Sequence, residues 1–144
     1  RKTSAKIDRY KGKVIDQTYK YVRPQETGNK TDIRWLALYN GSVGLMVKGL
    51  PVFDGSVHHY DYALLDYYKG SQLHGKTDII KGDQIDLIVD HKQMGVGGDN
   101  SWGAKPHPKY TLPMDTTVYN LEYAIIPFNK KNELDALSRL NMDN

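Results

Sequence analysis

The stretch from Ile33 to Tyr39 most constrains how this chain can fold, because its apolar side chains would occupy both faces of an extended strand. Alternate residues of a strand point to opposite faces of the sheet. One face carries four apolar residues and the other carries two: Ile33, Trp35, Ala37 and Tyr39, and then Leu36 and Leu38. A strand that is apolar on both faces is covered on both faces. We therefore expect a layered β structure.

The composition favours the same class. The 144 residues include 11 Tyr and 13 Gly, whereas Glu occurs only at positions 26, 122 and 133, a balance that suits strands and tight turns better than helices. Asn40-Gly41 follows the two-sided strand and is typical of a two-residue type I′ hairpin turn, which should lead into a strand from Val43 to Lys48. The length suits one domain. We predict a single all-β region, a β-sandwich with short peripheral helices.

Weaker patterns predict the remaining elements. Residues that alternate in polarity, or that end at turn-forming residues, indicate further extended segments. A polar residue before an apolar period of three to four indicates a helix. The expected strands are Val14 to Val22, a segment ending at Ser56 to His59, Thr77 to Ile80 before a turn at Lys81 to Asp83, Gln84 to Val89, and Thr117 to Pro127; the expected helices are Asp61 to Tyr68 and a C-terminal one within 129–144, capped by Asn132.

Charge and residue usage exclude several function classes. A net charge of +3 is too small to demand a nucleic acid, and the basic run from Lys11 to Arg23 is better explained as a solvated strand face. No apolar run approaches the roughly 18 residues of a membrane span. The absence of Cys excludes disulfides and thiolate chemistry, and it leaves a cytoplasmic or a periplasmic location open.

The stretch from Gln93 to Pro108 is long, irregular and rich in glycine, which is typical of a functional loop. Glycines permit unusual backbone conformations, so such a loop can present an indole together with short polar groups. An indole face covers the C–H patch of a sugar ring while carboxylates and amides bind hydroxyls. The alternative is a Trp buried at the end of a sandwich. The candidate substrate-binding residues are Trp102, Asp99, Asn100 and Ser101, and the loop-shaping residues are Gly95, Gly97, Gly98 and Gly103.

Other chemistry is poorly supported by the sequence. The glycines of this loop do not precede a helix that could hold a dinucleotide. His58-His59 and His107 lack an acidic partner at a metal-binding spacing, so we interpret them as surface or hydrogen-bonded side chains and predict no metal site. Glycoside hydrolysis generally needs two carboxyl groups about 5–9 Å apart. The three Glu residues lie in a turn, on a strand and in the tail, so we expect no Glu pair; an Asp pair stays open, although no motif marks one. We predict no catalytic residue in this chain.

Two long segments of the chain are specific enough to compare with known motifs. They are Tyr21-Val22-Arg23-Pro24-Gln25-Glu26-Thr27-Gly28-Asn29-Lys30-Thr31-Asp32-Ile33-Arg34-Trp35, and Gln93-Met94-Gly95-Val96-Gly97-Gly98-Asp99-Asn100-Ser101-Trp102-Gly103 followed by Pro106-His107-Pro108 and Tyr110. Both resemble motifs of the C-terminal domain of family 2 β-galactosidases, in the same order. The resemblance covers about Val14 to Phe128, with Thr27 in place of a common Asn and Asn100 in place of a frequent Asp. Residues 129–144 extend beyond the usual end.

The resemblance implies the later half of a mutarotase-like supersandwich, the last of five domains in an enzyme that cleaves terminal β-galactose, lactose included. It implies that the catalytic glutamates and the Mg²⁺ and Na⁺ sites belong to upstream domains. Trp102 matches a tryptophan at the active-site mouth of the family. On this basis we expect an aromatic wall of the aglycone subsite, no cofactor within this portion, and an oligomeric parent. The alternatives are a carbohydrate-binding module and a purely structural or oligomerisation domain.

Overall fold

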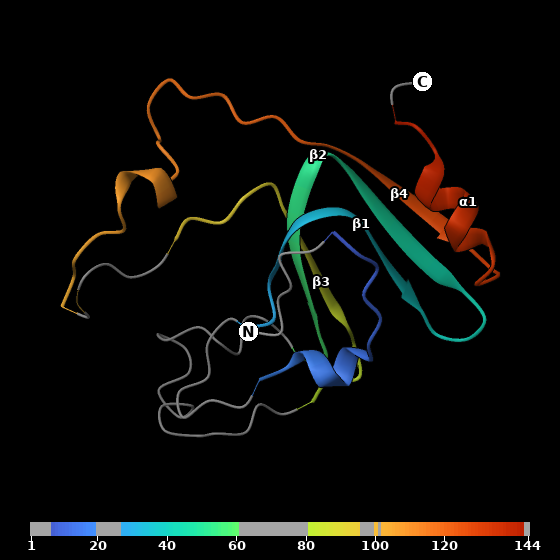
Figure 1. The fold of residues 1–144 in the computed structure, drawn as a ribbon. Coiled ribbons are helices and arrows are strands. Elements are labelled where there is room, and N and C mark those ends of the chain that lie inside the picture. The colour runs from blue at the N-terminus through green and yellow to red at the C-terminus, as the bar shows by residue number, and fades with distance from the viewer. Residues whose placement is uncertain (1–6, 20–26, 61–80, 96–99, 101, 143–144) are drawn as a thin grey trace. The chain divides into compact units, whose positions relative to one another are not determined.

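A computed structural model describes residues 7–19, 27–60, 81–95, 100 and 102–142. The chain divides into two compact units, one made of residues 1–31 and 55–89 and the other of residues 32–54 and 90–144. The described part is mostly antiparallel sheet with a few short helices (Figure 1). This confirms the predicted all-β class and is consistent with a sandwich-like domain. None of the helices in the described ranges has the length and apolar character needed to cross a bilayer.

Strand β2 is the centre of the four-stranded sheet that the described residues form. Its neighbours are β1 and β3, and its first half also pairs with β4. In the antiparallel β2–β4 ladder, Gly44 lies opposite Phe128 and Leu50 lies opposite Glu122. The bounds are Val14–Gln17 for the 3₁₀ helix η1, Lys30–Tyr39 for β1, Gly44–His58 for β2, Asp86–Asp90 for β3, Pro108–Tyr110 for the 3₁₀ helix η3, Glu122–Phe128 for β4 and Glu133–Arg139 for α1.

Strand β1 confirms the strand predicted from Ile33 to Tyr39. The four residues 35–38 at its centre are all partly buried, so both faces are partly covered, as the two-sided apolar pattern requires. The hairpin to β2 is also confirmed, but its turn is not type I′. Gly41 has a φ of 109°, whereas Asn40 does not have a positive φ. The Asn40 side-chain oxygen instead accepts the N–H groups of Ser42 and Val43, at 3.0 and 2.9 Å.

Strand β2 also shows where the predicted boundaries were wrong. The segments expected at Val43 to Lys48 and near Ser56 to His59 are one strand of 15 residues that runs through Pro51. The final strand, expected from Thr117, begins only at Glu122. Its ladder stops where Leu50 pairs with Glu122, directly before Pro51, which has no N–H to donate. Pairing therefore cannot continue in register toward Thr117.

The strand expected from Val14 to Val22 is a further correction. Residues Val14–Gln17 form η1, stabilised by bonds to the Lys13 carbonyl from the Asp16 N–H at 3.1 Å and the Gln17 side-chain amide at 3.0 Å. Ile15 is 48% exposed and Tyr19 is 72% exposed. The alternating side chains therefore have no buried face to pack against, and local hydrogen bonds decide the conformation. Positions 20–22 lie outside the described residues.

The predicted strand from Gln84 and the predicted C-terminal helix are both present, but the predicted helix cap is not. Strand β3 confirms the segment expected from Gln84 to Val89, with a slightly later start. The expected C-terminal helix is present as α1, but Asn132 does not cap it with its side chain. Its backbone is already helical, at φ −69° and ψ −12°, a conformation unlike that of a capping residue. The predictions at Asp61 to Tyr68 and at Thr77 to Ile80 lie outside the described residues.

The core centres on β2. Buried apolar side chains in the described part come chiefly from this strand, and Phe128 of β4 stacks on Tyr39 of β1 at a centroid distance of 5.7 Å. Because β2 is long, it carries buried residues of both compact units and also the polar residue Asp54. The buried apolar residues are Met46, Val47, Phe53, Val57, Tyr60 and Phe128.

Candidate functional site

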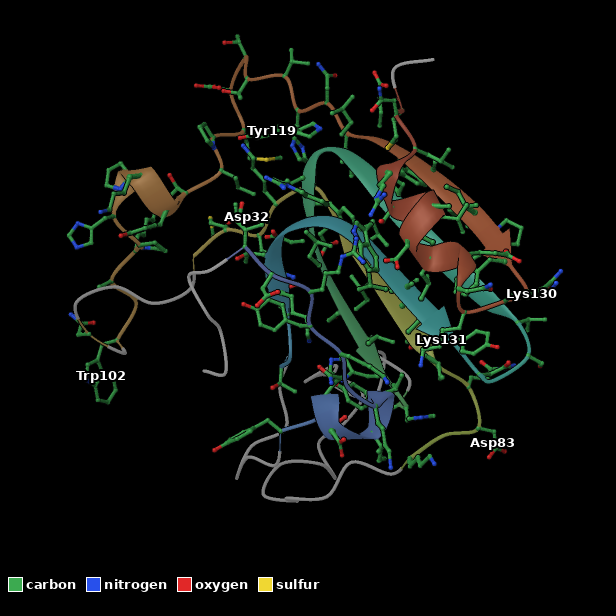
Figure 2. All side chains as sticks on the ribbon, turned by 45° about the vertical axis from the view of Figure 1, so that its right-hand side comes forward. Asp32, Asp83, Trp102, Tyr119, Lys130 and Lys131 are labelled. Carbon is green, nitrogen blue, oxygen red and sulfur yellow. The ribbon has the colours of Figure 1, made fainter. Side chains whose placement is uncertain are left out.

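Trp102 is the exposed centre of the candidate site. Its side chain is 92% exposed, and Figure 2 shows it pointing away from the ribbon. The alternative interpretation, a Trp buried within this chain, is therefore wrong. An exposed indole places a large apolar face in water, which is costly unless a ligand or a partner covers it.

The backbone around Trp102 is held by its neighbours. The side-chain oxygen of Asn100 accepts the Trp102 N–H at 2.9 Å, a local bond that ties the Asn100 side chain to the backbone at Trp102. Gly103 follows with a φ of 103°, which L side chains rarely adopt. Asn100 thus holds the backbone at Trp102 with one oxygen, while its amide nitrogen stays available for a further bond.

The ends of the stretch that carries Trp102 meet. The Gly95 N–H donates to the Tyr110 carbonyl at 2.8 Å, and a Cβ at Gly95 would lie 3.0 Å from the Tyr110 Cβ. A side chain at position 95 would crowd Tyr110, so this close approach favours glycine. Residues 95–110 therefore form a closed loop, here called the Trp102 loop, whose described members are Gly95, Asn100 and residues 102–110. Gly97, Gly98, Asp99 and Ser101 lie outside the described residues.

One side of the loop base is an open hollow lined by His107, Pro108, Lys109 and Tyr110. The Lys109 amino group lies 4.5 Å from the centre of the Tyr110 ring, close enough for a cation–π contact. Tyr110 is 54% exposed. The loop base thus offers a second aromatic surface.

Asp54 on β2 holds the chain that enters the loop, a function that sequence analysis missed. Its carboxylate accepts the Gln93 N–H at 3.2 Å and the Asp32 N–H at 3.3 Å. The Gln93 side chain in turn donates to Asp90 at 2.9 Å. A charged residue between the buried Phe53 and Gly55 was the available signal, since an Asp inside a strand usually has a specific partner.

Partial burial is the main cause that raises the pKa of Asp54 above its ordinary value of 3.8. The two backbone bonds lower this pKa, and the nearby Asp32 and Asp90 raise it further. A raised folded-state pKa means that the folded state prefers the protonated carboxyl. The stability that this preference contributes is complete below pH 3.8 and is lost as the pH rises through the folded-state pKa.

This sign gives a testable pH dependence. We expect the apparent melting temperature of the full-length protein to fall relative to that of an Asp54→Asn variant as the pH rises from about 3.5 to about 6. The variant carries no titrating group at this position, so the difference isolates Asp54. A difference that stays constant, or one that changes in the opposite direction, would contradict the raised pKa.

Of the candidate histidines, His107 belongs to the Trp102 loop and lines the hollow at its base, whereas His58 and His59 are on other segments. His58 is buried, with Nε2 at 2.7 Å from the Thr27 carbonyl oxygen and Nδ1 at 3.3 Å from the Thr18 hydroxyl, and its ring stacks on Tyr60. It is therefore a hydrogen-bonded packing residue. Within the described ranges, no group of three or more His, Asp or Glu side chains is placed to hold a metal ion. The Mg²⁺ and Na⁺ that the resemblance implies for a full-length enzyme stay a prediction.

Comparison with known proteins identifies the family to which this chain belongs. Residues 1–125 match the family described as beta galactosidase small chain, and this chain belongs to that family. It is 43% identical over 113 residues to a beta-galactosidase of Priestia megaterium, which covers 78% of this chain and 10% of that protein. Beta-galactosidases of Halalkalibacterium halodurans and Vibrio cholerae are 33% and 34% identical over 80% and 82% of the chain, and over 11% and 10% of their own lengths. The chain spans about a tenth of these relatives.

Proposed function

We propose that this chain is the C-terminal part of a β-galactosidase, an enzyme that hydrolyses terminal non-reducing β-D-galactose residues, and that it contributes an aromatic wall of the aglycone subsite. The observation that carries the proposal is the 92% exposure of Trp102 on a loop whose ends are joined by the Gly95–Tyr110 bond. Family membership supports the parent activity. The chain supplies binding surface, while the catalytic carboxylates come from upstream domains of the same enzyme.

The chemistry of sugars explains why an indole suits this role. One face of a pyranose ring is made of C–H groups, and an aromatic ring packs on that face without needing hydrogen bonds. The ring beyond the scissile bond varies between galactosides. A flat apolar surface can bind such different rings because its contact does not depend on where their hydroxyl groups lie. Polar groups beside the indole, such as the Asn100 amide, would add orientation. Hydrolysis itself would follow the retaining, two-carboxylate route, with a covalent galactosyl intermediate.

The division of labour can be tested directly. We expect the polypeptide encoded by the complete reading frame to release galactose from lactose, and we expect residues 1–144 alone to release none, because the proposal places the catalytic carboxylates in upstream domains. The measurement is galactose release by each purified protein at equal concentration. Turnover by residues 1–144 alone would contradict the assignment of catalysis to upstream domains, and an inactive complete polypeptide would contradict the parent activity.

A further inference from the structure

The Asp54 carboxylate joins three distant parts of one compact unit. One oxygen accepts the backbone N–H of Asp32, 22 residues earlier, and the other accepts the backbone N–H of Gln93, 39 residues later. Each carboxylate oxygen therefore has its own donor. Backbone donors do not change rotamer, so a bond to them fixes the path of the chain more firmly than a bond to a side chain. The carboxylate connects the start of β1 with the segment that enters the Trp102 loop.

The segment from Gln93 to Gly95 is held at both ends. Gln93 is bound to Asp54 through its backbone and to Asp90 through its side-chain amide. Two residues later, the Gly95 N–H binds the Tyr110 carbonyl and closes the loop. Between these bonds only Met94 intervenes, so the position of the loop base on the sheet depends on Asp54. Any movement at Gln93 would be passed to the loop that carries Trp102.

The backbone at Asp32 shows that the same carboxylate holds an unfavourable conformation. Asp32 has a φ of 57°, in the left-handed region that costs a non-Gly residue roughly 1 kcal/mol. Figure 2 shows Asp32 at the start of β1. Residues remain in such conformations only where the surroundings impose them. The bond from the Asp32 N–H to Asp54 is one such constraint.

We infer that Asp54 is a positioning residue for the Trp102 loop: its carboxylate fixes the loop base on β2 and thereby sets where the indole meets the substrate. The inference rests on the proposed function, because it gives Trp102 a ligand to meet. Asp54 touches no substrate itself. An Asn at this position has a single acceptor oxygen and so satisfies only one of the two backbone donors. A carboxylate has two acceptor oxygens and can therefore accept both backbone N–H groups.

The first test measures the tether without any activity. In the full-length protein, Asp54→Ala should speed amide hydrogen exchange at Gln93 and Asp32 by about tenfold, since both lose their acceptor. Asp54→Asn should speed exchange at one of the two amides. The matched control is Asp115→Ala, because Asp115 accepts the Thr117 N–H at 2.9 Å in an exposed turn away from the loop. Unchanged exchange at Gln93 in the Asp54→Ala variant would overturn the inference.

The second test separates this inference from the proposed function. Asp54→Ala should raise the KM for lactose about fivefold with a smaller change in kcat, and this effect should disappear in a Trp102→Ala background, where no indole remains to be positioned. A merely structural Asp54 would lower activity equally in both backgrounds, and that result would overturn the inference. If Trp102→Ala raises KM and Asp54→Ala does not, positioning fails while the proposed function stands. If Trp102→Ala has no kinetic effect, the proposed function fails. The inference that Asp54 positions the indole then fails as well, whatever the amide hydrogen exchange shows, because the indole has no role in catalysis.

Discussion

Replacing Trp102 with Ala in the full-length enzyme is expected to lower kcat/KM for lactose about 30-fold. The loss corresponds to roughly 2 kcal/mol of apolar contact between the indole and the second sugar ring. The indole is available for this contact because it is 92% exposed and its loop is closed at the base. Phe should recover part of the loss, since it keeps a flat apolar face of smaller area. Steady-state kinetics on lactose measure the effect.

The same substitution should change the fate of the galactosyl intermediate. An acceptor sugar would lie on the same indole as the leaving sugar, so transglycosylation should fall together with hydrolysis, and the ratio of galactosyl products to free galactose should drop. The matched control is Met114→Ala, because Met114 is an apolar side chain that is 93% exposed in the same compact unit. Lactose kinetics and product ratios in the Trp102→Ala variant that equal those of the unmodified enzyme would discard the aromatic wall.

Local chemistry explains which parts of the fold could be predicted from sequence. The Asn40-Gly41 hairpin depends on residues next to one another, and it was found. At the turn expected from Lys81 to Asp83, the Gly82 N–H instead binds the distant His59 carbonyl. The strand Ile33 to Tyr39 was found because its two apolar faces exclude other conformations. The segment Val14 to Val22 failed because alternation alone does not say whether a covering face exists. Its exposed Ile15 and Tyr19 show that none does among the described residues.

In the candidate site, too, features that depend on neighbouring residues could be considered from the sequence, whereas contacts between distant residues were missed. A glycine-rich stretch around an indole left an exposed and a buried Trp both open, and the exposure of Trp102 decides between them. The Asp54 carboxylate was missed because its donors are 22 and 39 residues away in the sequence. No spacing rule joins an Asp within one strand to the backbone near the start of another strand and to the residue that leads into a loop. Such contacts follow from sheet order, which only the structure supplies.

Helix α1 lies beyond the residues matched to the family, and one buried lysine attaches it to the sheet. Figure 1 shows α1 beside β2 and β4. The Lys48 amino group on β2 donates to the carbonyls of Leu137 and Ser138, both at 3.2 Å, and to that of Leu140. These carbonyls end the helix, where the partial negative charge of the helix dipole favours a cation. The charge of Lys48 is thus satisfied by the extension.

Lys48→Met should therefore release α1 from the sheet. The change keeps the apolar stem of the side chain but removes its charged amino group. We expect the attachment of α1 to lose about 3 kcal/mol. Amide exchange in residues 134–140 should then be faster by on the order of 100-fold. Hydrogen exchange in the full-length protein measures this. Lys130→Met is the control, because Lys130 is exposed just before the helix (Figure 2). Because the Lys48 amino group binds carbonyls at the end of α1 and we assign it no bond to the Trp102 loop, lactose kinetics should stay unchanged. Slow exchange in α1 after Lys48→Met would show that apolar packing alone holds the helix.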